Sequence, residues 1–166
     1  MTLIGRIIGT WRDPRGAIRA LLAGPAREDR ALAVLMGAAA LVGVGQIPAA
    51  TAAAARDPAI PLDARIGGAL MGAVFVLPLF AYALAAASRI VARLFGGRGS
   101  WFGARMALFW ALLAVQPAVL IHAALEAVLG RGAVSGGVGI VAFAGFLYLW
   151  LGMLIAAESP ATAERV

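Results

Sequence analysis

The amino-acid sequence predicts an all-α, polytopic membrane protein with four transmembrane helices and an amphipathic N-terminal segment. Of the 166 residues, 63% are apolar and 13% are charged, whereas soluble domains have about 45–50% apolar and about 25% charged residues. The apolar residues fall into long runs that reach the ~20 residues a membrane-spanning helix needs. An ordinary soluble enzyme is therefore excluded.

Residues 1–30 are predicted to be an amphipathic surface segment rather than a span. Apolar residues recur at helical spacing over residues 3–11, with arginines between them. Asp13 and Pro14 are typical of an N-cap and a first helical position, and Gly24 of a helix end. We expect the segment to lie on the membrane surface with its arginines toward phosphates. The alternative is that it packs on the cytoplasmic end of the bundle itself.

The four predicted spans cover residues 31–54, 66–88, 101–129 and 138–157, and the second has an apolar tail to residue 95. Polar or glycine-rich turns separate the spans, and Glu158-Ser159-Pro160 ends the last one. We therefore expect one helical membrane domain over residues 31–158 and a short cytoplasmic tail over residues 159–166.

The distribution of arginine predicts the orientation. Residues 1–30 hold six arginines and residues 89–105 hold four, against two in residues 56–65 and one at Arg131. Because arginine gathers on cytoplasmic loops, both termini are predicted to be cytoplasmic. The chain uses arginine and no lysine, which is typical of a GC-rich bacterial genome. We therefore expect the bacterial inner membrane.

The net charge of +6 indicates anionic lipid headgroups rather than nucleic acid, because no aromatic–basic nucleic-acid pattern accompanies it. Membrane lipids and other integral membrane proteins are the expected partners. The candidate lipid or partner contacts are Arg15, Arg19, Arg89, Arg93, Arg98 and Arg105.

Several short stretches together resemble the Yip family, the membrane proteins named for interaction with Ypt/Rab GTPases. The stretch 11–15 reads WRDPR ahead of the first span, Gln116-Pro117 lies in the third span, and Leu149-Trp150-Leu151 lies in the fourth. The most specific element is the loop of Gly96, Gly97, Gly99, Ser100 and Trp101. The resemblance implies a bacterial helical membrane scaffold with no known chemistry. Such proteins typically have five spans, so it also implies a member without the fifth.

Four polar side chains are predicted to lie within spans. His122 and Glu126 share one helix face, and we interpret them as a structural hydrogen bond or a contact to a neighbouring subunit; the alternative is a proton relay or quinone contact. Gln46 precedes Pro48 and Gln116 precedes Pro117. In each case the glutamine could satisfy the carbonyl that a proline leaves free, or bridge helices. A transporter would use such broken helices to bind substrate.

Two small-residue spacings are candidate helix-packing faces. They are Gly68-x-x-x-Gly72, inside the second span, and Gly132-x-x-x-Gly136. Such spacings let helices approach closely, and we expect the first of them to do so.

The sequence offers little material for catalysis or cofactors. There is no cysteine and only one histidine, which excludes thiolate metal sites and leaves too few ligands for haem or zinc within one chain. Ser100 and Ser135 have no base expected at the same depth. We therefore expect a non-catalytic protein without cofactors, metal ligands or catalytic residues.

The predicted function is a membrane scaffold or organising protein that acts through protein and lipid contacts. One alternative is an accessory subunit of a larger respiratory or photosynthetic complex of the inner membrane. The other is a small transporter or channel. Binding at a fixed ratio to one complex would favour the first alternative, and substrate flux in liposomes the second.

Overall fold

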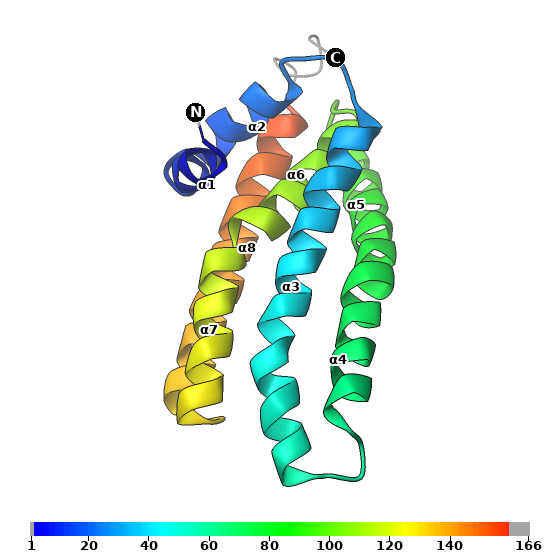
Figure 1. Ribbon diagram of the computed structural model, residues 1–166. Coiled ribbons are helices and arrows are strands. Elements are labelled where there is room, and N and C mark those ends of the chain that lie inside the picture. The colour runs from blue at the N-terminus through cyan, green and yellow to red at the C-terminus, as the bar shows by residue number, and fades with distance from the viewer. Residues whose placement is uncertain (1, 160–166) are drawn as a thin grey trace.

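The computed structural model describes residues 2–159, and every regular element in that part of the chain is a helix (Figure 1). Of the tail predicted over residues 159–166, residues 160–166 lie outside the described part. In chain order the elements are α1 (Leu3–Arg12), α2 (Pro14–Leu22), α3 (Glu28–Arg56), α4 (Leu62–Met71), the π-helical turn η1 (Gly72–Val76), α5 (Leu77–Leu94), α6 (Trp101–Ala114), α7 (Gln116–Leu129) and α8 (Ala133–Ala157).

Three helices are long and apolar enough to cross a membrane. They are α3, the continuous run of α4, η1 and α5, and α8. Helices α6 and α7 meet at a bend of 40° and make a fourth if the bent pair is one span. The prediction of an all-helical fold with apolar helices of membrane-spanning length is therefore confirmed.

Three helices begin earlier than the sequence predicts. The first long helix begins at Glu28, where residue 31 is predicted, and the second begins at Leu62, where residue 66 is predicted. Helix α8 begins at Ala133, where residue 138 is predicted. The start of α8 is held by Ser135, whose hydroxyl accepts from Gly132 N at 3.0 Å and donates to Gly130 O at 2.8 Å. Ser135 therefore stabilises the first turn of α8. The glycines around it made this turn unpredictable from the sequence.

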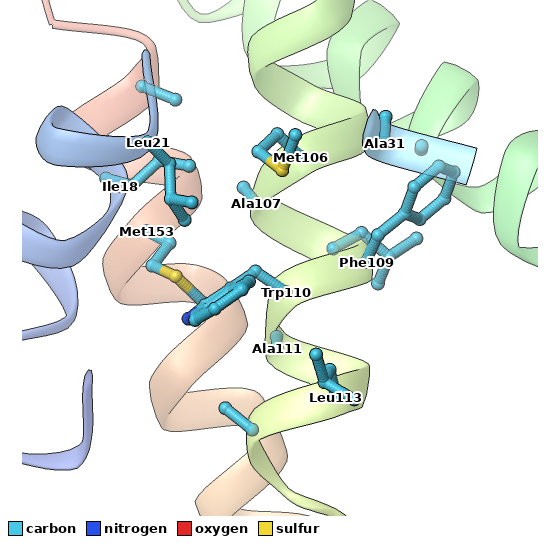
Figure 2. Close-up of a cluster of buried hydrophobic side chains, with 14 of the residues drawn as sticks. Ile18, Leu21, Ala31, Met106, Ala107, Phe109, Trp110, Ala111, Leu113 and Met153 are labelled. Carbon is cyan, nitrogen blue, oxygen red and sulfur yellow. The ribbon is translucent and has the colours of Figure 1, made fainter. Parts of the chain in front are cut away.

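Helix α6 is the buried centre of the bundle. Most of its residues are inaccessible to solvent, including Phe109 and Met106, and it packs against α3, α5 and α8. Figure 2 shows α6 side chains facing Ile18 of α2 and Met153 of α8. The helices around α6 keep their outer apolar side chains exposed. Helix α6 is therefore buried by the chain itself, whereas the outer faces of the other helices are not.

The N-terminal helices pack on the bundle, which was the alternative to a purely surface location. The Asp13 carboxylate accepts from Gly16 N at 2.8 Å, which confirms the predicted N-cap of α2. Ile18 is fully buried against the bundle. In α1, the hydroxyl of Thr10 accepts from Trp110 Nε1 at 2.9 Å. Leu3 and Ile4 remain exposed, so the outer face of α1 keeps the apolar surface expected of an interfacial helix.

The fold gathers ten of the arginines at one end, called here the arginine-rich end. This end holds α1, α2, the start of α3, the close of α5, the loop 95–100 and the close of α8 (Figure 1). The opposite end holds the loops 57–61 and 130–132, with Arg56, Arg65 and Arg131 nearby. The charge asymmetry in the sequence is thus an asymmetry of the folded molecule.

The small-residue spacings do not pack helices together within this chain. A Cβ built on Gly68, Gly72, Gly132 or Gly136 would meet nothing within 4 Å. The prediction that Gly68 and Gly72 form a close packing face is therefore wrong for the described residues. The close contact is made by Gly43 of α3, where a Cβ would lie 2.9 Å from Leu70 Cδ2.

Candidate functional site

The glycine-rich loop first closes helix α5. Gly96 has φ +84°, and Gly96 N donates to Arg93 O at 3.1 Å while Gly97 N donates to Ala92 O at 2.8 Å. These are the two bonds of a Schellman C-cap, which needs a residue of left-handed conformation. The Ser100 hydroxyl then accepts from Gly103 N at 2.9 Å and caps α6. Gly96, Gly97 and Ser100 therefore have structural roles, and Trp101 is half exposed beside them.

The same loop receives the end of α8 through Glu158. The carboxylate oxygen Glu158 Oε2 accepts from Gly99 N at 2.8 Å, and the Glu158 carbonyl accepts from Arg98 N at 3.1 Å. A Cβ on Gly99 would lie 2.5 Å from the carbonyl oxygen of Ala157. Gly99 is therefore required because α8 ends directly against the loop.

A buried ion pair completes this junction. Arg89 Nη1 lies 3.1 Å from Glu158 Oε2, and the two side chains are only 11% and 8% exposed. Arg89 therefore does not reach out to lipid as predicted; it ties the last turns of α5 to the end of α8. Glu158 was interpreted as a stop signal alone, because nothing in a single sequence relates residue 158 to residue 89.

The junction also keeps unpaired polar atoms. Glu158 Oε1 and Arg89 Nε are buried without a hydrogen-bond partner among the described residues, and so is Trp150 Nε1 on the neighbouring turns of α8. Buried polar atoms are nearly always paired in folded proteins. These three atoms, by contrast, have no hydrogen-bond partner within residues 2–159.

An apolar groove runs from this junction along the seam between α5 and α8. Its upper part has a volume of about 530 Å³. The lining includes Leu84, Ala87, Ser88, Val91 and Ala92 of α5, Trp150 and Leu154 of α8, and Phe95, Gly97 and Glu158 at the junction. A second hollow of about 470 Å³ shares Leu84 and Ala87 with it and has Leu108 and Leu112 of α6 as its floor. The two form one groove, called here the α5–α8 groove. Volumes of this order are typical of small-molecule sites.

The six candidate arginines divide into two groups. Arg89 pairs with Glu158, and Arg105 pairs with Glu28 at the start of α3. Arg15, Arg19, Arg93 and Arg98 are exposed, and the structure shows no ion pair for them among residues 2–159. The second group is therefore the one available to anionic ligands.

A second, polar cavity lies at the opposite end between α3 and α7. It has a volume of about 740 Å³, and its lining brings together Gln46, His122 and Glu126 as well as the charged residues Arg56, Asp57, Arg65 and Arg131. Arg65 Nη2 lies 3.1 Å from Asp57 Oδ2, and Arg131 Nε lies 2.6 Å from Glu126 Oε1. Three of the four predicted intramembrane polar residues therefore share one site.

The predicted His122–Glu126 hydrogen bond is not formed. His122 Nε2 lies 3.7 Å from Glu126 Oε2, beyond hydrogen-bond distance, because Glu126 turns its other oxygen to Arg131. His122 Nδ1 is buried and has no hydrogen-bond partner in the part of the chain that the structure describes. The imidazole lies against Gly139 of α8, where a Cβ would be 3.1 Å from His122 Cε1. The histidine is thus held by packing and by a long ion-pair contact.

The fourth residue, Gln116, lies at the bend between α6 and α7. Its side-chain amide donates from Nε2 to Leu112 O at 2.9 Å, as predicted for a carbonyl released near a proline. Ala114 O at the same bend accepts from Trp11 Nε1 of α1 at 3.0 Å. The side chains of Gln116 and Trp11 therefore donate hydrogen bonds to the two carbonyls at the bend. Gln46 at the other proline has no such bond in the structure and lines the polar cavity instead.

Within residues 2–159, no group of three or more His, Asp or Glu side chains is placed to hold a metal ion. Comparison with family models, with curated proteins and with solved structures finds no match to this chain. The features that bear on function are therefore the arginine-rich end, the polar cavity at the opposite end and the α5–α8 groove.

Proposed function

We propose that this protein is a non-catalytic scaffold of the bacterial inner membrane that organises lipids and other integral membrane proteins. In this proposal the chain crosses the membrane four times, with α6 and α7 as one bent span, and the arginine-rich end is cytoplasmic. The Yip-like loop supports a scaffold of that type. It holds α5, α6 and α8 at one junction and carries no reactive group.

The observation that carries the proposal is the large apolar surface the chain leaves uncovered. In the most apolar stretches of the long helices, only 17–28% of residues are buried inside the protein. Exposed side chains such as Leu79, Phe80 and Ile140 would be covered by lipid or by partner helices. A bundle with one buried helix and a bilayer-facing groove is suited to lateral contacts.

A pulldown of the tagged full chain in mild detergent, with mass spectrometry of the bound proteins and lipids, tests this proposal. We expect several integral membrane proteins and phospholipid to be enriched over an unrelated tagged membrane protein of similar size. Recovery of one complex at a fixed ratio would favour the accessory-subunit alternative instead. Recovery of neither protein nor lipid above the control would contradict the scaffold.

The polar cavity favours a small transporter as the second candidate function. It places ionisable side chains of α3 and α7 around a space of about 740 Å³, and such groups in apolar helices frequently mark ion or proton pathways. Purified protein in liposomes with a pH-sensitive dye would detect proton-coupled flux. Under the scaffold proposal, wild type and a His122→Gln variant both give the leak of protein-free liposomes.

A further inference from the structure

We propose that the α5–α8 groove binds one acyl chain of an anionic phospholipid from the cytoplasmic leaflet, with the phosphate at Arg98. This inference rests on the membrane location and orientation in the proposed function, and it names a lipid class and a site. The groove offers three properties that one such lipid would satisfy together.

The first property is the length of the apolar wall. From Leu84 to Phe95 the upper part of the groove follows α5 for about 17 Å, at about 1.5 Å per residue. Half of the ~30 Å hydrocarbon core is about 15 Å. The wall therefore matches the depth of a single leaflet, and its lining is apolar except for Ser88, Trp150 and the end near Glu158 and Gly97.

The second property is the charge at the polar end. Glu158 is neutralised by Arg89, while Arg98 in the loop is exposed beside the lining residue Gly97. The groove thus opens at a site of net positive charge, which complements a phosphate that carries no compensating cation. An apolar partner helix would cover the wall of the groove, but it would not supply the negative charge that complements this end.

The third property is an unused donor in the wall of the groove. Trp150 lines the upper part, and its indole N–H is covered by the protein and has no acceptor among the described residues. It lies seven residues before the end of α8 at Ala157, or about 10 Å below that end. This is below the phosphate level, where a glycerol ester carbonyl would supply the missing acceptor. Tryptophan is enriched at this level of membranes.

Native mass spectrometry of the full chain in mild detergent tests the site, with added dioleoyl phosphatidylglycerol or dioleoyl phosphatidylcholine as probes. The two probes share their acyl chains, so a difference reports the headgroup. We expect one tightly held phosphatidylglycerol per protein and weaker phosphatidylcholine binding. Equal retention of the two lipids would overturn the anionic specificity.

Two pairs of variants locate the site. Ala87→Phe fills the part shared by the two hollows and should abolish the phosphatidylglycerol adduct, whereas Ile90→Phe, on an exposed part of α5 outside the lining, should keep it. Arg98→Gln should lower the relative affinity for phosphatidylglycerol about fivefold, since an arginine near an anionic lipid contributes roughly that factor. Arg93→Gln is the matched control, because Arg93 is equally exposed but lies on the face of α5 opposite to the lining, and it should leave the affinity unchanged.

The outcomes separate this inference from the scaffold proposal. Loss of lipid in Ala87→Phe with membrane partners still recovered supports the lipid site. If Ala87→Phe keeps its lipid but loses a membrane protein partner, the groove is a helix-docking site and the inference is overturned. If the protein binds phosphatidylglycerol but recovers no membrane partners in the pulldown, the lipid site is supported and the scaffold proposal is contradicted.

Discussion

At the scale of single residues, the Arg89–Glu158 pair holds the arginine-rich end together. The two side chains come from residues far apart in the chain, and both are nearly buried. Removing one partner of a buried pair leaves an uncompensated charge and typically costs about 3–5 kcal/mol, whereas replacing both by apolar residues of similar size is often neutral. The pair therefore makes α5, the loop and α8 dependent on one another.

We predict that Arg89→Gln lowers the free energy of unfolding in detergent by about 3 kcal/mol, and that Arg89→Met combined with Glu158→Leu restores most of it. Arg131→Gln is the control, because Arg131 is 91% exposed in its pair with Glu126 and exposed pairs contribute about 0–1 kcal/mol. Chemical denaturation followed by tryptophan fluorescence measures all three. Equal losses for Arg89→Gln and Arg131→Gln would contradict the role given to the buried pair.

His122 separates the scaffold from a proton-handling site at the same scale. The ring is held by packing against Gly139 and by a long contact to Glu126, so His122→Gln removes little, in line with the ~0.6 kcal/mol average of membrane hydrogen bonds. An amide cannot titrate near neutral pH as an imidazole does. We expect the His122→Gln strain to grow like wild type at matched protein level. Growth as poor as that of a deletion strain would favour the proton or quinone role.

At the scale of elements, the bend between α6 and α7 joins the N-terminal segment to the bundle. Trp11 of α1 donates to the Ala114 carbonyl released at the bend, and the Arg6 guanidinium lies 4.9 Å from the Trp110 ring. A net hydrogen bond contributes about 1 kcal/mol, and a cation–π contact about 0.5–1 kcal/mol at exposed sites. Helix α1 is thus attached by these polar contacts and by Ile7 and Trp11, which pack partly buried against the core, while α2 is attached by its buried apolar face.

We predict that Trp11→Phe lowers the free energy of unfolding by about 1–2 kcal/mol, since it leaves the Ala114 carbonyl unsatisfied. Trp101→Phe is the matched control, because Trp101 is 49% exposed and has no hydrogen bond in the structure; its change should stay below about 0.5 kcal/mol. Thermal unfolding of the two variants in the same detergent makes the comparison. A Trp11→Phe variant as stable as the control would show that the bend needs no donor from α1.

The element scale also shows what a single sequence can predict. The apolar runs predict the long helices, and Asp13 predicts the start of α2. Both predictions succeed because spanning length and helix capping are local properties of the sequence. The widened turn η1 before Pro78 and the early start of α8 were missed. Pro78 removes a main-chain donor, and a π-helical turn accommodates this in a way that hydropathy does not reveal.

The candidate site was predicted in part for the same reason. The loop 96–101 and the residues His122, Glu126 and Gln46 were singled out from local patterns, and the structure groups the last three around one cavity. Glu158, Trp150 Nε1 and the α5–α8 groove depend on which helices lie side by side. That information is long-range, so Arg89 was assigned to lipid although it binds Glu158.

At the scale of the whole molecule, the proposal depends on the orientation of the bundle. The exposed arginines, the loop 96–101 and the polar end of the groove all lie at the arginine-rich end, and they contact anionic lipid only if that end is cytoplasmic. The polar cavity then opens toward the opposite side. One topological measurement therefore tests the scaffold, the lipid site and the predicted spans together.

That measurement is single-cysteine accessibility, which the absence of cysteine from the chain makes clean. Ala59→Cys lies in the loop between α3 and α4, and Arg98→Cys in the loop between α5 and α6; both positions are exposed. In intact spheroplasts, a membrane-impermeant thiol reagent should label the cysteine at position 59 and reach the one at position 98 only after permeabilisation. Labelling at position 98 with protection at position 59 in intact spheroplasts would contradict the account.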